Sequence, residues 1–221
     1  GWNASSVTLI VAPVFHLTGA VWVQSSLFLG AQQVVSAATS AALILSAIQR
    51  WGVTHTVLVP TMIHMVMNEM AASGQTVETL KTITYGGAPM PVALLREALV
   101  RFPNCTFVQG YGLTETNSPV TFLAPDDHVL DGPKSRLNSV GRGYLEIKVR
   151  IFNTDAGVIC QPGEIGEVQI HSPWIMLGYR NQPELTASVF TADGWFRTGD
   201  GASMDAEGYL FLADRINDMI I

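Results

Sequence analysis

Short apolar runs alternate with amphipathic stretches through the first half of the chain. The runs are rich in Val, Ile and Thr and end near Pro or Gly, a pattern typical of buried strands in a parallel sheet. The intervening stretches space their apolar residues as helices do. The pattern predicts strands over 7–13, 31–36, 54–60, 82–85 and 106–109, and helices over 20–29, 41–51, 61–72 and 91–101. This alternation predicts a parallel sheet with covering helices.

Glycine and proline mark the expected helix ends. Gly52 directly follows the second predicted helix, and Pro91 is expected in the first turn of the fourth. The apolar spacing of the second helix assigns four of its residues to the core: Leu43, Leu45, Ile48 and Trp51.

The pattern changes near Asp131-Gly-Pro133, after which the apolar segments are short, alternating and separated by turn residues. Strands are predicted over 147–152, 166–171 and 208–212. The predicted fold class is therefore α/β, with a mostly parallel sheet and covering helices followed by a smaller antiparallel β-barrel-like subdomain. The predicted domains are 1–135 for the α/β part and 136–213 for the β-rich part.

Composition narrows the class of protein. With 48% hydrophobic and 14% charged residues among 221, the chain is not of the disordered type. A net charge of −6 and the lack of basic runs argue against a nucleic-acid partner. The longest apolar stretch, 34–48, contains several Ser and Thr residues and is too short and polar to span a bilayer. Cys105 and Cys160 are far apart and form no C-x-x-C, which favours reduced thiols and a cytoplasmic location.

Candidate chemistry lies in loops that follow predicted strands. In doubly wound sheets ligands bind beyond the carboxyl ends of the strands, where the segments 85–90 and 109–116 fall. Their glycines allow close approach of the backbone to a ligand. Tyr111 offers a ring for stacking, Thr114 a hydroxyl donor, and Glu115 a hard oxygen ligand suited to Mg²⁺. Asp200, at the end of Gly194-Trp-Phe-Arg-Thr-Gly-Asp200, offers a carboxylate for a ribose diol.

These motifs resemble those of the adenylate-forming superfamily, which comprises acyl- and aryl-CoA synthetases, peptide-synthetase adenylation domains and beetle luciferases. The resemblance rests on Tyr111-Gly-Leu-Thr-Glu-Thr116, Gly194-Trp-Phe-Arg-Thr-Gly-Asp200 and Asp214-Arg215. Gly163-Glu-Ile-Gly-Glu167 and Gly178-Tyr-Arg-Asn-Gln-Pro-Glu184 match the connecting region. The motifs keep the family's order and cover essentially the whole chain.

The resemblance implies a nucleotide site. Adenine would lie between Tyr111 and the backbone of Gly86, Gly87 and Ala88. Thr114 would contact the α-phosphate, Glu115 would hold Mg²⁺, and Asp200 with Arg215 would bind the ribose hydroxyls. The remaining nucleotide-binding residue that the resemblance implies is Gly112.

Two further residues are assigned by the resemblance. His16, in Pro13-Val-Phe-His-Leu-Thr-Gly19, matches the histidine that shapes and gates the acyl pocket in the CoA-ligase branch; packing in the core is the structural alternative. The resemblance also implies that 214–221 is the start of a hinge to a small carboxy-terminal domain. Asn217 falls at the position about which that domain rotates, where the family more often has Asp or Lys.

The implied reaction is ATP-dependent activation of a fatty or aryl carboxylic acid as acyl-AMP, followed by transfer to CoA. A peptide-synthetase adenylation domain is disfavoured by Phe15-His16, because that branch usually carries Phe-Asp there. Two further hypotheses are a non-catalytic nucleotide-binding module and a luciferase-like oxygenase. The family's phosphate loop would precede Gly1 and its carboxy-terminal lysine would follow Ile221, so we expect the chain to be an inactive part of an enzyme.

Other polar residues have no pattern that points to chemistry. His55, His64, His128 and His171 are expected to serve structure or face solvent, and Arg197 is expected to form a structural ion pair.

Overall fold

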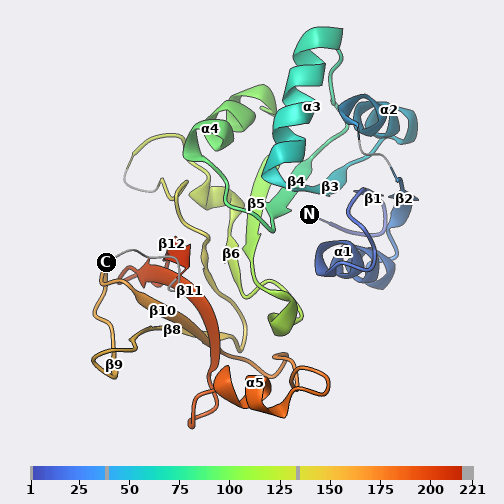
Figure 1. Cartoon of the computed structure of the whole chain (residues 1–221). Helices are drawn as coiled ribbons and strands as arrows, with labels where there is room; N and C mark the ends of the chain where they lie inside the picture. Colours follow the sequence, from blue (N-terminus) through green and yellow to red (C-terminus); the bar gives the residue numbers. More distant parts are fainter. Residues whose placement is uncertain (1, 38–39, 133–134, 216–221) are drawn as a thin grey trace. The chain divides into compact units, whose positions relative to one another are not determined.

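The structure, a computed structural model, describes residues 2–37, 40–132 and 135–215 (Figure 1). It divides into two compact units, residues 1–109 with 124–138 and residues 110–123 with 139–221, and each unit is described by itself. The functional domain boundaries predicted at 135/136 and 213/214 stay predictions.

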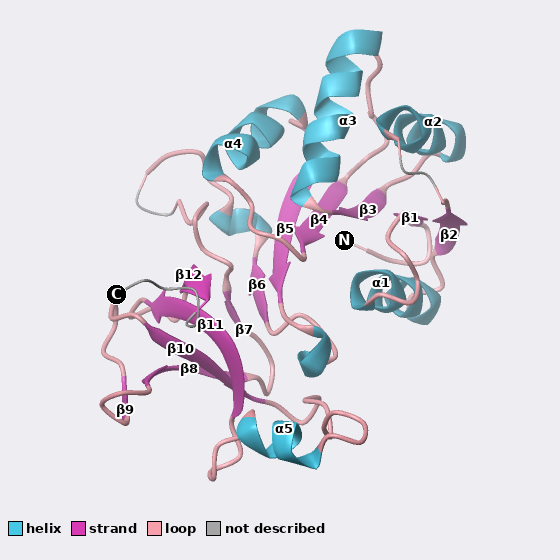
Figure 2. Cartoon of the chain, in the orientation of Figure 1, coloured by secondary structure: helices cyan, strands magenta, loops and turns pink. Residues whose placement is uncertain are grey.

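The first unit contains the predicted parallel sheet and its helices (Figure 2). Strands β1, β2, β3 and β4 pair in parallel in the order β2-β1-β3-β4, and β5 is the next neighbour. The strands are β1 Val7–Ile10, β2 Gln32–Val35, β3 His55–Leu58, β4 Thr82–Gly86 and β5 Thr106–Tyr111. The helices are α1 Leu17–Phe28, α2 Ala41–Trp51, α3 Pro60–Ser73 and α4 Val92–Arg101.

The two faces of this sheet bury different sets of side chains. Leu9 and Leu58 belong to the large core cluster that also contains residues of α2, α3 and α4. Ile10 and Val57, their neighbours in sequence, pack instead with Trp22 of α1. Alternate strand residues therefore serve opposite faces, and helices cover both. The predicted α/β architecture is confirmed.

Some local details differ from the prediction. Leu43 and Trp51 are 57% and 47% exposed, whereas Ile44 is buried with Leu45 and Ile48. The core face of α2 is thus rotated from the predicted one: the buried residues Ala41, Ile44, Leu45 and Ile48 recur at helical spacing and form one stripe. Pro91 is the residue before α4 rather than part of its first turn.

The second unit is built on a five-stranded antiparallel sheet in the order β12-β11-β10-β8-β9. Its buried core includes Val168, Ile170, Ala202 and Leu210. The strands are β8 Lys148–Asn153, β9 Val158–Ile159, β10 Gly166–His171, β11 Phe196–Met204 and β12 Leu210–Arg215. Among the described residues of this unit there is one α-helix, α5 Pro183–Ser188.

Two short strands complete the strand order of the larger sheet. β6 Thr121–Leu123 and β7 Arg142–Gly143 are antiparallel to each other and belong to the second unit. With them the sheet has seven strands, β2-β1-β3-β4-β5-β6-β7. Single turns of 3₁₀ helix form η1 Thr114–Thr116 and η2 Pro125–Asp127.

Two expectations from composition concern membrane-spanning segments and the cysteine thiols. None of the helices in the described part of the chain is both long and apolar enough to cross a membrane. Cys105 and Cys160 are free thiols, and burial raises the pKa of Cys105 to about 12, so this group is inert at neutral pH.

Candidate functional site

The loop after β5 is fixed by close backbone packing and one buried hydroxyl. A Cβ on Gly112 would lie 2.5 Å from the Ser118 carbonyl oxygen, so only glycine fits there. The Thr116 Oγ1 accepts from the Leu113 N–H at 2.9 Å and donates to the Ser118 carbonyl at 2.8 Å. Thr116 itself is buried. These contacts hold η1, and with it Thr114 and Glu115, in one conformation.

Tyr111 and Asp200 meet within the second unit. The Tyr111 hydroxyl donates to Asp200 Oδ2 at 2.7 Å, a charge-assisted hydrogen bond between residues 89 positions apart. The ring of Tyr111 packs against the apolar core of this unit. Two residues that the sequence assigns to adenine and ribose are thus in direct contact.

A β-bulge sets the direction of Asp200. On β10, Glu167 faces Gly201 and Gln169 faces Arg197, so the residues between Arg197 and Gly201 oppose Val168 alone. Gly199 takes a φ of +74°, which favours glycine, and the Asp200 N–H donates to Thr198 Oγ1 at 3.0 Å. Bulges commonly re-aim a side chain beside a functional site, and here the Thr-Gly-Asp sequence supplies the bulge and the carboxylate together.

The backbone of Arg215 lies opposite that of Asp200 in the pairing of β11 with β12. The predicted ribose pair is therefore formed by facing positions of adjacent strands. The side chain of Arg215 and the predicted hinge residue Asn217 lie outside the described part of the molecule.

Glu115 is held by the segment that precedes α5. The Tyr179 hydroxyl donates to Glu115 Oε1 at 2.9 Å, and the Met176 N–H donates to the Glu115 carbonyl at 2.8 Å. The neighbouring Thr114 side chain is exposed, as a group that contacts a ligand must be.

The donor set suits Mg²⁺ bound together with phosphate. No group of three or more His, Cys, Asp or Glu side chains able to hold a metal is found among the described residues. Mg²⁺ usually takes only one or two protein carboxylates and completes its shell with substrate phosphates and water. The half-buried Glu115 carboxylate therefore fits the magnesium ligand that the sequence predicts.

The first unit holds the other predicted residues. Gly86 ends β4, and Gly87 follows with a φ of +73°. A Cβ on Gly87 would lie 4.0 Å from Thr18 Oγ1, so this loop adjoins the amino-terminal end of α1. His16 is the N-cap of that helix, where its Nδ1 accepts from the Thr18 N–H at 3.3 Å. The structure thus brings the His16 turn and the Gly86-Gly87-Ala88 loop together.

A buried pair supports the base of this loop. The Tyr85 hydroxyl and His128 Nε2 are 2.9 Å apart, and His128 Nδ1 is 2.7 Å from the Ala124 carbonyl oxygen. Because a carbonyl can only accept, Nδ1 carries the proton and the tyrosine donates to Nε2. Burial lowers the pKa of His128 and raises that of Tyr85, which keeps both groups neutral. The expectation of a structural role for His128 agrees with these contacts.

A polar network links the strands that carry Asp200. Arg197 Nε lies 3.0 Å from Glu167 Oε2, as expected for a structural ion pair, and Glu167 accepts from Gln169. Gln169 in turn accepts from Arg150, which pairs with Asp193 at 2.9 Å. This network fixes the register of β8, β10 and β11 beside the bulge.

The predicted site residues fall into two groups. The second unit holds Tyr111, Gly112, Thr114, Glu115 and Asp200, whereas the first holds His16, Gly86, Gly87 and Ala88.

The sequence motifs assign no role to Tyr179, although it lies within one of them. The signal that could have found Tyr179 is its place directly after Gly178 in a motif that accompanies Glu115.

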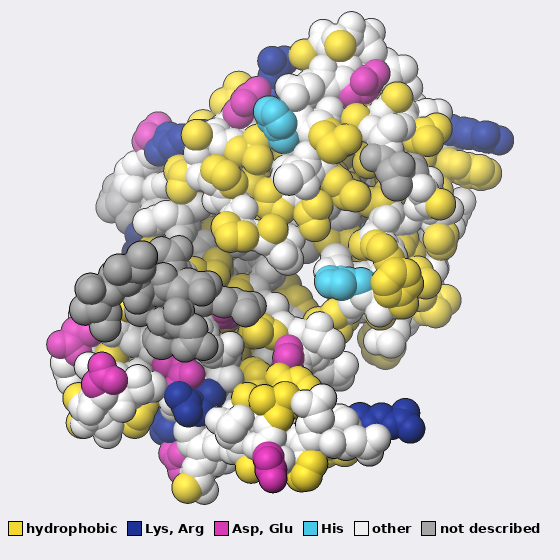
Figure 3. All heavy atoms as spheres, in the orientation of Figure 1, with side chains coloured by type: hydrophobic (Ala, Val, Ile, Leu, Met, Phe, Trp, Pro, Cys, Tyr) yellow, Lys and Arg dark blue, Asp and Glu magenta, His cyan; other side chains and the backbone are white. Residues whose placement is uncertain are grey.

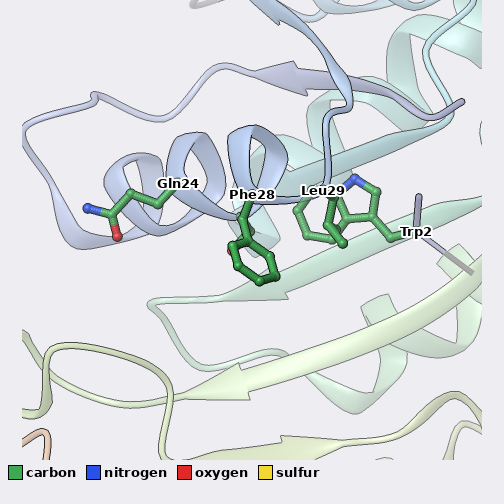
Figure 4. A pocket seen from close by; sticks show the side chains of 5 residues that line it. Trp2, Gln24, Phe28 and Leu29 are labelled. Carbon is green, nitrogen blue, oxygen red and sulfur yellow. The ribbon is translucent and has the colours of Figure 1, made fainter. Parts of the chain in front are cut away.

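A separate apolar hollow of about 410 Å³ lies beside α1 (Figure 4). Trp2, Gln24, Phe28 and Leu29 line it with Ser25, and Phe28 is 92% exposed. Apolar side chains are widely exposed on the face seen in Figure 3. None of the predicted site residues lines the hollow, so it takes no part in the candidate nucleotide site.

Comparison with known proteins places this arrangement in a family. A family model described as AMP-binding enzyme matches residues 1–180. A fatty acid–[acyl-carrier-protein] ligase, ScoC of Streptomyces coeruleorubidus, is 34% identical over all of this chain and 41% of its own length. A feruloyl-CoA synthase of an Amycolatopsis species is 35% identical over 96% of this chain and 42% of its own length. The chain thus spans well under half the length of these relatives.

Solved structures agree in fold. The o-succinylbenzoate CoA synthetase MenE of Bacillus subtilis, in complex with ATP and magnesium, superposes with a TM-score of 0.86 at 30% identity, over 100% of this chain and 44% of that one. The amide bond synthetase McbA of Marinactinospora thermotolerans gives 0.87 at 32% identity, over 100% and 43%. Together with the family match over most of its length, these likenesses show that the chain belongs to the AMP-binding enzyme family.

Proposed function

We propose that the chain is part of an AMP-forming acid–thiol ligase, which activates a carboxylic acid with ATP and passes the acyl group to a thiol. The observation that carries this proposal is the Tyr111–Asp200 hydrogen bond of 2.7 Å, formed beside a bulge and opposite the backbone of Arg215. It brings together the ring proposed to stack on the base and the carboxylate proposed to accept from the ribose. Family membership and the ATP complex of MenE support it.

In the first half-reaction a substrate carboxylate oxygen attacks the α-phosphorus of ATP. The new bond is a carboxyl–phosphate anhydride, and the bond to the β-phosphate oxygen breaks to release pyrophosphate. Tyr111 would stack on the base, the backbone of Gly86, Gly87 and Ala88 would contact the base, and Asp200 would accept from the ribose hydroxyls. Thr114 would donate to the α-phosphate. Such groups act by positioning two anions that otherwise repel each other.

Mg²⁺ would be held by Glu115 and would supply charge that offsets the negative phosphates. The protein's own contribution is to keep the Glu115 carboxylate in place through Tyr179 and the η1 loop.

In the second half-reaction a thiolate attacks the carbonyl carbon of acyl-AMP, and the carbon–oxygen bond to AMP breaks. We propose CoA as the thiol. A carrier-protein thiol is the second candidate, because ScoC, one of the similar proteins, is a ligase for an acyl carrier protein. His16, at the start of α1, would shape the acyl pocket next to the Gly87 loop.

The acid is proposed to be a fatty or aryl acid. Two of the similar proteins are, by their names, a fatty acid ligase and a feruloyl-CoA synthase, and the small residues at 86–88 leave space for either kind of acyl group. A peptide-synthetase substrate is less consistent with this chain, because His16 stands where that branch carries a carboxylate.

The test is acid-dependent exchange of labelled pyrophosphate into ATP, with the full-length protein and a panel of fatty, aryl and amino acids. We expect exchange with a fatty or aryl acid, and acyl transfer to CoA in a second assay that includes a carrier protein as the competing acceptor. AMP binding without exchange for any acid would overturn the proposal in favour of a nucleotide-binding module. Exchange with amino acids alone would favour a peptide-synthetase adenylation domain.

A further inference from the structure

Tyr179 lies in a segment between β10 and α5 and contacts the candidate magnesium ligand directly. We propose that Tyr179 is a positioning residue that holds the Glu115 carboxylate in the orientation needed to bind Mg²⁺ with ATP. The inference rests on the proposed function, because it concerns how the same site keeps its metal ligand in place.

Two hydrogen bonds join this segment to Glu115. The Tyr179 hydroxyl donates to Glu115 Oε1 at 2.9 Å, while the Met176 N–H donates to the Glu115 carbonyl at 2.8 Å. One bond fixes the side chain and the other fixes the backbone of the same residue. All three residues belong to the second unit, so the contact is internal to one compact body.

Tyr179 is itself held from the other side by α5. Its N–H donates to Thr186 Oγ1 at 2.9 Å, and that hydroxyl donates to the Gln182 carbonyl at 2.8 Å. A Cβ on Gly178 would lie 2.6 Å from Thr186 Cγ2, so the backbone at Gly178 packs directly on the helix. A continuous chain of contacts therefore runs from α5 through Thr186 and Tyr179 to Glu115.

The chemistry of the contact suits a metal ligand. A phenol donates one hydrogen bond and carries no charge, so it orients a carboxylate without neutralising it. The ordinary pKa of a tyrosine is about 10, so the hydroxyl keeps the proton that it donates at neutral pH. Outer-shell partners of this kind commonly change metal affinity by roughly ten- to a hundredfold when removed.

The experiment compares Tyr179→Phe with Tyr144→Phe in the full-length protein. Tyr144 is a matched control, because its hydroxyl also makes a hydrogen bond within the second unit, to the Pro119 carbonyl at 3.1 Å, and does not touch Glu115. Calorimetry measures ATP binding at increasing Mg²⁺ concentrations and also in its absence, so the readout is independent of turnover. Tyr179→Phe should raise about tenfold the Mg²⁺ concentration that gives half-maximal enhancement of ATP binding. The affinity for ATP in the absence of Mg²⁺ should change little.

A second set of variants separates this inference from the proposed function. In a Glu115→Gln background, Tyr179→Phe should add almost nothing to the loss of Mg²⁺ dependence, because both changes act through one carboxylate. If wild type and Glu115→Gln show the expected difference but Tyr179→Phe matches Tyr144→Phe, the positioning role is wrong and the proposed function stands. If Glu115→Gln responds to Mg²⁺ as wild type does, the metal assignment itself fails, and the inference fails with it.

Discussion

The most direct test of the nucleotide site is removal of the Asp200 carboxylate. In the proposed site this group accepts from the ribose hydroxyls, and in the structure its Oδ2 accepts from Tyr111 at 2.7 Å. Charge-assisted hydrogen bonds contribute roughly 1.5–3 kcal/mol each. Losing one such bond to the ligand predicts ATP binding weaker by about ten- to a hundredfold in Asp200→Ala.

A nucleotide pair distinguishes loss of the clamp from general damage. Wild type should bind ATP more tightly than 2′,3′-dideoxy-ATP, and Asp200→Ala should bind both equally weakly in a calorimetric titration. Tyr111→Phe removes the hydroxyl that contacts Asp200 but leaves the carboxylate, so it should keep the preference for ATP. His16→Ala, in the other unit, should also keep it.

Two outcomes would contradict a ribose-binding role for Asp200. If Asp200→Ala still prefers ATP over the dideoxy analogue, the carboxylate does not bind the ribose. If His16→Ala abolishes the preference as fully as Asp200→Ala does, the effect is not local to the clamp. Acid specificity should change little in Asp200→Ala, because the ribose end of the nucleotide is remote from the acid.

Three other outcomes are expected. Glu115→Gln should lower acid-dependent pyrophosphate exchange steeply and weaken its Mg²⁺ dependence, and an unchanged Mg²⁺ titration would contradict the metal role. The 221-residue chain alone should release no AMP in the presence of acid and CoA, since it spans less than half the length of the ligases that it resembles. Burial lowers the pKa of both His55 and His128, so the free energy of unfolding should fall as the pH drops below about 6.5, where the unfolded chain binds protons more readily. Urea titrations across this pH range should show a smaller fall in the free energy of unfolding for His128→Gln than for wild type. An identical pH dependence in the two proteins would count against a buried, neutral His128.

The regular elements of the first unit could be predicted because their signals are local. Helix α2 runs over the predicted 41–51, with Ser40 as its N-cap and Gly52 as its C-cap. In the second unit, strand β10 likewise covers the predicted 166–171. In both cases a change of periodicity coincides with a residue that ends the element.

Other features depend on contacts that no local pattern shows. The sequence does not predict strand β11, because its bulge interrupts the alternation of apolar and polar residues around Gly199. The core face of α2 is a different case. The buried Ala41, Ile44, Leu45 and Ile48 do recur at helical spacing, so the assignment of Leu43 and Trp51 to the core is wrong although a local pattern shows the buried face.

In the candidate site, the residues proposed to contact the ligand could be named from the sequence, whereas those that hold them in place could not. Glu115 and Asp200 are assigned from the order of the motifs, because each carboxylate alone would be expected at a helix start or in a turn. The residues that hold them give no chemical signal. Thr116 fixes the η1 loop through two hydrogen bonds, and Gly199 permits the bulge that directs Asp200. A motif of this family therefore encodes a backbone conformation together with its reactive groups, and for that reason the spacing within each motif matters as much as the residues that would touch the nucleotide.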